Sequence, residues 1–176
     1  MSERRSAGSE SPRTLEGRYV AVIGAGECSG ETYEAARSIG SELARRGAIL
    51  VCGGLGGVME AAARGALEGG GVSVGILPGR TRARACPYLT VALPTGMGEA
   101  RNALVVRAAD GVIAVAGEWG TLSEIGLALK MGKPVVGLET WELAQKGRPL
   151  RAYREATGPV EAVTLLEGLW RGDWMV

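Results

Sequence analysis

Four glycines within residues 53–57 most constrain how this chain can fold, because they separate an apolar run from an alanine-rich segment. The run at residues 48–52 is typical of a buried parallel strand, and residues 58–68 are typical of a helix. One glycine would serve a tight turn between them, and such a turn is the plain alternative. Four glycines let several backbone amides approach an anion at a helix N-terminus. The segment therefore predicts a phosphate-binding loop.

The same succession of apolar run, turn and amphipathic helix recurs along the chain. Strands alternating with helices predict an α/β fold, namely a Rossmann-like, doubly wound and mainly parallel sheet of six or seven strands in three layers. We expect strands near residues 19–23, 48–52, 72–77, 89–93, 111–116 and 134–138, with a weaker one within 150–155. We expect helices near 31–46, 58–68, 99–109 and 121–131, and a last one from residue 159.

The 176 residues fit one domain, which we place at 17–176. Residues 1–16 are polar and lack the apolar centre of a signal peptide, so they predict a disordered N-terminal tail. The 20 basic and 19 acidic residues nearly balance, and no apolar run is long enough to span a bilayer. We therefore expect neither nucleic acid nor a membrane as a partner. Three separated cysteines indicate a reducing, cytoplasmic setting.

The chain contains no histidine, which excludes Ser-His-Asp and Cys-His catalysis and histidine metal ligands. It also has no Cys-x-x-Cys pair, so we expect no metal site. Any acid–base chemistry must use Glu, Asp, Lys, Tyr or Cys.

Three loops with unusual residues, at 24–30, 53–57 and 117–121, follow predicted strands. Ligands of open parallel sheets bind at the carboxyl ends of the strands, so these loops share the expected binding edge. The candidate ligand-binding residues are Gly24, Gly26, Gly53, Gly54, Gly56, Gly57, Met59, Gly117, Gly120 and Thr121.

An NAD site would require more than the first of these loops provides. Residues 24–30 have the spacing Gly-x-Gly-x-x-x-Gly, which only approximates a dinucleotide fingerprint. A usual NAD site also has an acidic residue at the end of the second strand to hold the ribose, whereas this chain has Gly53 there. An NAD(P)-linked oxidoreductase is therefore disfavoured. It stays a third hypothesis for the function, after the ligand-binding and hydrolase hypotheses given below.

Glu124 and Arg101 are the candidate catalytic residues, and each has a structural alternative. Thr121 and Glu124 have the spacing of a capping box, in which Glu124 would reach back to the helix start. In the functional reading, Glu124 faces the crevice as an acid or base. Arg101 would either pair with a ligand phosphate or lie solvated on the surface.

Several motifs together resemble the lysine-decarboxylase-like Rossmann superfamily, which includes the Lonely Guy phosphoribohydrolases and the molybdenum cofactor carrier proteins. They are Val-Ile-Gly-Ala-Gly at 22–26, Cys-Gly-Gly-Leu-Gly-Gly-Val-Met-Glu at 52–60, Gly-Ile-Leu-Pro at 75–78, Arg101-Asn102, and Gly-Glu-Trp-Gly-Thr-Leu-Ser-Glu at 117–124. By this resemblance Glu124 and Arg101 would be catalytic, and Gly120 and Thr121 would cradle a phosphate. It also implies a homo-oligomer, either a dimer or a tetramer. Lysine decarboxylation is not expected, because nothing marks a Schiff-base lysine.

The sequence departs from the hydrolase motif Pro-Gly-Gly-x-Gly-Thr-x-x-Glu. Ala116 replaces the proline, Glu118 replaces the second glycine, and Asn102 stands where the hydrolases have lysine. These departures resemble the carrier-protein branch more closely. We therefore expect binding of a small phosphorylated, nucleotide-like ligand, such as the molybdenum cofactor or a nucleoside monophosphate. The alternative is a nucleoside 5′-monophosphate phosphoribohydrolase that cleaves the N-glycosidic bond.

Overall fold

The computed structural model describes residues 13–172 and contains a seven-stranded parallel sheet of strand order β4-β3-β2-β1-β5-β6-β9. The predicted Rossmann-like fold of three layers is confirmed. The strands of this sheet are β1 (Tyr19–Gly24), β2 (Ile49–Cys52), β3 (Val72–Leu77), β4 (Val91–Pro94), β5 (Gly111–Val115), β6 (Val135–Leu138) and β9 (Arg154–Ala156). The helices are α1 (Gly30–Arg45), α2 (Val58–Glu68), α3 (Asn102–Ala108), α4 (Trp119–Lys130) and α5 (Pro159–Arg171).

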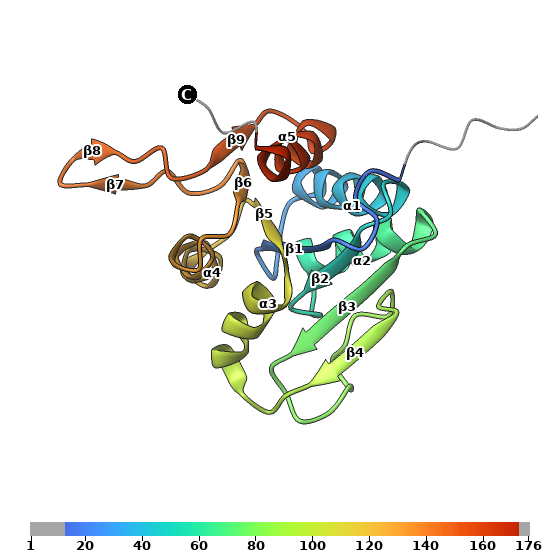
Figure 1. Ribbon diagram of the computed structural model, residues 1–176. Coiled ribbons are helices and arrows are strands. Elements are labelled where there is room, and N and C mark those ends of the chain that lie inside the picture. Colours follow the sequence, from blue (N-terminus) through green and yellow to red (C-terminus); the bar gives the residue numbers. More distant parts are fainter. Residues whose placement is uncertain (1–12, 173–176) are drawn as a thin grey trace, which may run out of the picture.

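Helices cover both faces of the sheet (Figure 1). Alternate strand residues point to opposite faces, so each strand contributes to two cores. Val22 and Leu50 belong to the core beneath α1, α2 and α5. Ile23 and Val51 belong to the core beneath α3 and α4. Within residues 13–172, no helix has the length and apolar character needed to cross a membrane.

Two glycines bring α1 and α2 unusually close together. A Cβ at Gly40 would lie 2.0 Å from the Ala62 carbonyl oxygen, and one at Gly65 would lie 1.8 Å from the Arg37 carbonyl oxygen. Only glycine permits this contact between the helix backbones. The close contact fixes α2, whose N-terminus contributes to the site.

The two crossovers that flank β1 and β5 lie on opposite faces of the sheet. The chain leaves β1 through α1 on one face and leaves β5 through α4 on the other, although β1 and β5 are paired in the sheet. This divergence is the topological switch point, where doubly wound folds form their binding crevice.

The predicted disordered tail is wrong for its last residues. Leu15 is 1% exposed within the core, and its amide donates to the Arg46 carbonyl at 2.8 Å. Burial of one leucine orders this segment despite its polar composition. The rest of the predicted tail, residues 1–12, lies outside the described residues, as do residues 173–176 of the predicted domain.

Two local predictions also differ from the structure. The predicted helix at 99–109 divides into a 3₁₀ turn, η1 (Gly98–Arg101), followed by α3. The segment after β6 forms a small antiparallel hairpin, β7 (Ala144–Gln145) and β8 (Arg148–Pro149), which projects from the body (Figure 1). The weak strand expected within 150–155 is β9, shifted toward the C-terminus.

Candidate functional site

A cavity of about 250 Å³ lies at the switch point, at the carboxyl ends of β1, β2 and β5. Most of the predicted site residues line it, namely Gly24, Gly26, Gly53, Met59, Arg101, Gly120, Thr121 and Glu124. Gly54, Gly56, Gly57 and Gly117 do not line the cavity, although they belong to the loops that frame it. The predicted loops therefore meet at one edge, but only part of each reaches the cavity.

Two helix N-termini open onto this cavity without a side-chain cap. Gly57, which has no side chain, precedes α2, and the side chain of Glu118 does not cap α4. The amide of Val58 at the start of α2 donates to the Ala25 carbonyl at 3.0 Å, so the later first-turn amides of α2 are the ones without a side-chain cap. The N-terminus of α1 differs, because Ser29 accepts a hydrogen bond there from the amide of Thr32 at 3.2 Å. Uncapped first-turn amides and the positive end of the helix dipole favour an anion. The cavity therefore has the backbone features of a phosphate site.

The glycines around the cavity have two different roles. Gly57 has φ of 61°, and a Cβ there would lie 2.3 Å from the Ala25 carbonyl oxygen, so glycine is required for the turn itself. A Cβ at Gly26 would meet no atom within 4 Å, and one at Gly120 would meet only Asn102 at 3.8 Å. Gly26 and Gly120 therefore leave space that a ligand can use.

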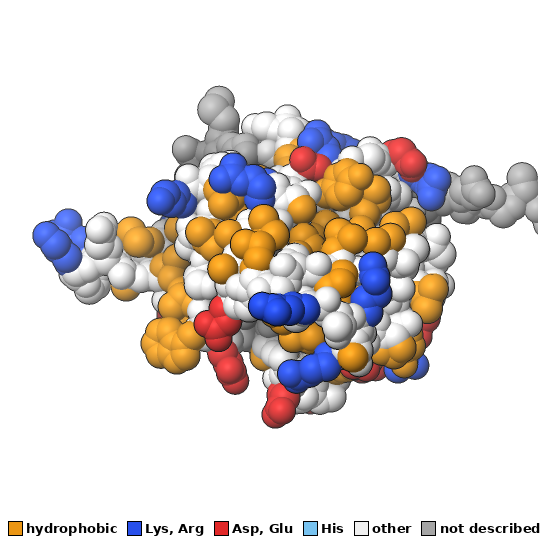
Figure 2. All heavy atoms as spheres, turned by 90° about the horizontal axis from the view of Figure 1, so that it is seen from below, with side chains coloured by type: hydrophobic (Ala, Val, Ile, Leu, Met, Phe, Trp, Pro, Cys, Tyr) orange, Lys and Arg blue, Asp and Glu red, His pale blue; other side chains and the backbone are white. Residues whose placement is uncertain are grey.

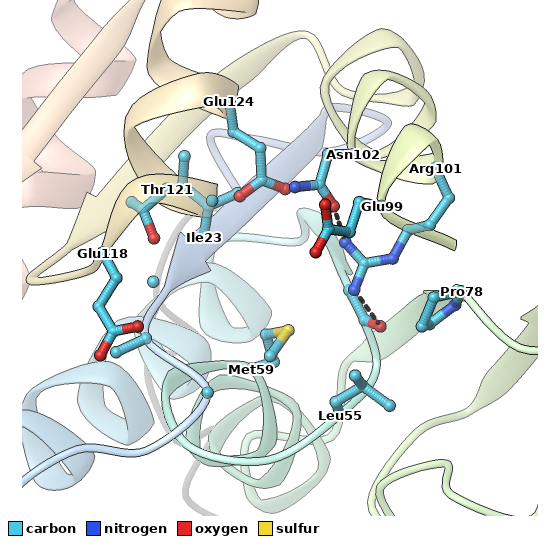
Figure 3. A pocket seen from close by; sticks show the side chains of 15 residues that line it. Ile23, Leu55, Met59, Pro78, Glu99, Arg101, Asn102, Glu118, Thr121 and Glu124 are labelled. Carbon is cyan, nitrogen blue, oxygen red and sulfur yellow. Dashed lines mark hydrogen bonds between the residues drawn. The ribbon is translucent and has the colours of Figure 1, made fainter. Parts of the chain in front are cut away.

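Arg101 is buried, with 7% of its surface exposed, and its guanidinium lies at the cavity wall. One terminal nitrogen donates to the Gly53 carbonyl at 3.2 Å and the other donates to the Asn102 side chain (Figure 3). Its Nε has no hydrogen-bond partner within residues 13–172. Burial lowers the pKa of Arg101, although Glu124 opposes this effect. The alternative of a solvated surface arginine is wrong.

Glu124 is 6% exposed and lines the same cavity from α4. Burial raises its pKa from 4.5 to about 7, and the positive charge of Arg101 partly counteracts the rise. Figure 3 shows the Asn102 amide between the carboxyl group of Glu124 and the guanidinium of Arg101. Glu124 can therefore exchange a proton near neutral pH, inside a site that also holds a fixed positive charge.

The capping-box alternative for Glu124 is wrong. Helix α4 begins at Trp119, so its N-cap is Glu118 rather than Thr121. Thr121 is instead buried in the first turn, at 3% exposed, and lies against Gly117. This arrangement leaves Glu124 in the second turn, where its side chain reaches the cavity.

Two further carboxylates, Glu99 and Glu118, line the cavity and are exposed. Figure 3 shows Glu118 on the far side of the cavity from Arg101, with Met59 between them. The negative charge of Glu118 is therefore separated from the cation. Carboxylates at the rim can accept hydrogen bonds from hydroxyl or amino groups of a ligand.

Sequence reasoning did not place Leu55 and Pro78 in the site, yet both line the cavity. Leu55 belongs to the motif at 52–60 and Pro78 to the motif at 75–78, and both motifs end predicted strands. Their positions at the binding edge could therefore have been predicted from the sequence. Asn102 was noted only as a departure from the hydrolase motif. The structure gives it a contact with Arg101.

Crowding around Gly53 explains why the second strand has no acidic residue at its end. A Cβ at this position would lie 2.5 Å from a terminal nitrogen of Arg101 and 2.7 Å from the Met59 sulfur. Arg101 thus occupies the space that a ribose-binding carboxylate would need. Within residues 13–172, no group of three or more His, Cys, Asp and Glu side chains is placed to hold a metal ion.

Comparison with known proteins identifies one family model and one relative that match most of the chain. The model of the SLOG cluster4 family (LDcluster4) matches residues 17–163. An uncharacterized protein from Archaeoglobus fulgidus is 48% identical over 120 residues, which cover 68% of this chain and 79% of that protein.

Two solved structures are similar over most of their length. The molybdenum cofactor binding protein from Rippkaea orientalis is 31% identical, with a TM-score of 0.78 over 87% of this chain and 97% of that one. The molybdenum cofactor carrier protein from Chlamydomonas reinhardtii is 30% identical, with a TM-score of 0.78 over 88% of this chain and 98% of that one. The resemblance to the carrier-protein branch is confirmed.

Proposed function

Because this chain belongs to the SLOG cluster4 family, we propose that it binds a phosphorylated, nucleotide-like ligand of the molybdenum-cofactor type in the switch-point cavity. One observation carries the proposal: the uncapped N-termini of α2 and α4 open onto the same cavity as the buried Arg101. Together these groups would neutralise a phosphate from three directions.

The carboxylates at the rim suit the part of such a ligand that adjoins its phosphate. In a nucleotide this part is a ribose, which carries hydroxyl donors. Glu99 and Glu118 can accept hydrogen bonds from these hydroxyls. The metal of the molybdenum cofactor would be cargo, since the described residues of the cavity offer it no cysteine or histidine ligand.

Calorimetry with inorganic phosphate and AMP, together with native mass spectrometry of the purified protein, tests this binding. We expect saturable binding without turnover. Gly26→Leu and Gly120→Val should abolish binding, because both side chains enter open space in the cavity. Gly126→Leu is the matched control, since its side chain enters open space on the exposed surface of α4. The absence of any bound anion would refute the proposal.

A second candidate function is supported by Glu124. A buried carboxyl with a pKa of about 7 can donate a proton to a departing base or accept one from water. Cleavage of the N-glycosidic bond of a nucleoside 5′-monophosphate requires such a group. Chromatography should then detect free base released from AMP, and Glu124→Gln should stop the release while AMP still binds. If no nucleoside monophosphate is turned over, the chain is a binding protein only.

We further propose that the chain forms a homo-oligomer. Val91 and Leu93 of the edge strand β4 are 41% and 45% exposed. Their strand register places them on the sheet face that also carries Val74 and Ile76. Figure 2 shows hydrophobic side chains gathered across the middle of the face seen from below, with Lys and Arg side chains around them. Exposed apolar areas of this kind are typical of protein interfaces.

A further inference from the structure

A second cavity of about 280 Å³ adjoins the first. Leu55 and Pro78 line both cavities, so these two side chains form the border between them. Figure 3 shows Leu55 and Pro78 beside Arg101, on the side away from Glu124. A ligand bound at Arg101 therefore needs to extend only past these two residues to enter the second cavity.

One backbone hydrogen bond and one side-chain hydrogen bond hold the outer wall of the second cavity. The amide of Cys86 donates to the Gly54 carbonyl at 2.9 Å, which joins the loop at 79–86 to the glycine loop. The Nε of Arg82 donates to the Ala92 carbonyl at 2.9 Å and attaches the same loop to β4. The loop at 79–86, which carries Arg80, Arg82 and Arg84, thus forms a cavity wall next to the proposed phosphate site.

The two cavities differ in chemistry. The first is bordered by Arg101, Glu124 and two helix N-termini, whereas Leu77 and Ala85 join Leu55 and Pro78 to make the second mainly apolar. The charged side chain of the second cavity is Arg84, which is exposed. A guanidinium at an apolar cavity favours the face of a ring or a ring acceptor atom.

Each cavity is smaller than the roughly 300–1,000 Å³ of ordinary small-molecule sites, but the two together fall within that range. We infer that they form one bipartite site, in which the first cavity holds the phosphorylated part of the ligand and the second holds a ring system with apolar faces. This inference rests on the proposed binding function. It predicts that the ligand is a phosphate ester that carries such a ring.

Gly79 offers a way to block the second cavity alone. A Cβ at Gly79 would lie 3.9 Å from its nearest neighbour, the Thr81 carbonyl oxygen, which is an ordinary contact. Gly79→Leu should therefore fold and fill the second cavity. Gly26→Leu blocks the first cavity, and Gly126→Leu on α4 is the control. Thermal melting of all three variants verifies that they are folded.

Calorimetry with inorganic phosphate, ribose 5-phosphate, AMP, GMP and UMP then tests the bipartite site. In the unmodified protein, we expect at least one nucleotide to bind about tenfold more tightly than ribose 5-phosphate, because its ring is buried. Gly79→Leu should remove this gain and leave phosphate and ribose 5-phosphate binding unchanged. Gly26→Leu should weaken every ligand, and Gly126→Leu none.

The outcomes separate the two proposals. If phosphate and ribose 5-phosphate bind but no nucleotide binds more tightly, or if Gly79→Leu keeps the nucleotide gain, the bipartite site is refuted and the phosphate site stands. If neither phosphate nor any of the esters binds to the unmodified protein, the proposed function itself fails.

Discussion

Arg101 and Glu124 face one cavity, yet within residues 13–172 the guanidinium of Arg101 donates to the Gly53 carbonyl and to Asn102 rather than to Glu124. The cation therefore remains without a carboxylate neutralising it directly, and Glu124 retains a raised pKa. A paired arrangement would lower the pKa of Glu124 and cancel the charge that attracts an anion. The separation by Asn102 thus suits a site that binds phosphate.

Replacing Arg101 by Met tests whether this residue serves binding rather than folding. Within residues 13–172 the Nε of the buried guanidinium has no partner, so its removal relieves a desolvation cost, but it also takes a donor from the Gly53 carbonyl. We expect these effects to offset each other, so that the free energy of unfolding changes by less than about 2 kcal/mol. Affinity for inorganic phosphate should fall at least about tenfold, because a charged hydrogen-bonding partner is lost. Urea unfolding and calorimetry measure the two effects.

Arg101→Lys provides the comparison, because it keeps the charge without the planar fork. It should recover part of the phosphate affinity. A large loss of stability in Arg101→Met, together with unchanged phosphate affinity, would assign Arg101 a structural role instead.

Glu124→Gln should change how stability depends on pH. The pKa of Glu124 is raised from 4.5 in the unfolded chain to about 7 in the folded protein, so the folded state retains a proton that the unfolded chain has released between these pH values. The stabilisation from the neutral carboxyl is complete below pH 4.5 and is lost as the pH rises to about 7. The loss is on the order of 3 kcal/mol.

Urea unfolding of both proteins between pH 4 and pH 9 measures this difference. Glu124→Gln has no proton to lose, so above pH 7 it should be more stable than the unmodified protein. Glu27→Gln, in an exposed loop, is the control for loss of a carboxyl group. Parallel stability curves for Glu124→Gln and the unmodified protein would contradict the raised pKa.

The sequence predicted the elements whose signals are local. Helix α2 occupies the expected residues 58–68, because an apolar run, a glycine cluster and an alanine-rich segment mark both of its ends. The start of α4 was misplaced because it depends on Glu118, whose extended φ and ψ of −115° and −160° let the helix begin at Trp119. Burial of Leu15 was missed for a related reason, since its partner Arg46 is distant in the chain.

The candidate site was predicted as an edge of the sheet but not as a cavity. Topology alone brings the carboxyl ends of parallel strands together, so the convergence of the glycine loops followed from strand order. The positions of Leu55 and Asn102 depend on how side chains pack across loops. No spacing rule in the sequence contains that information.

Leu93→Glu tests the proposed homo-oligomer. Leu93 is 45% exposed on the edge strand, so a charge there costs little in a monomer but is costly inside an apolar interface. We expect light scattering after size exclusion to show a smaller assembly than that of the unmodified protein. Val160→Glu, at a 54% exposed position on α5, is the matched control and should leave the assembly unchanged. An unmodified protein that is monomeric would refute the proposal.

Ala116 adopts a backbone conformation that proline, the residue at this position of the hydrolase motif, cannot adopt. Its φ is 47°, and its amide donates to the Leu138 carbonyl at 3.0 Å. Proline fixes φ near −65° and has no amide hydrogen, so Ala116→Pro should lower the free energy of unfolding by about 3 kcal/mol or more. Ala116→Gly keeps the amide and accepts a positive φ, so it should raise the free energy of unfolding by up to about 1 kcal/mol. Urea unfolding distinguishes these outcomes. Equal stability of the two variants would contradict this explanation. It would mean that the positive φ of residue 116 does not account for the absence of proline before the loop at 117–121.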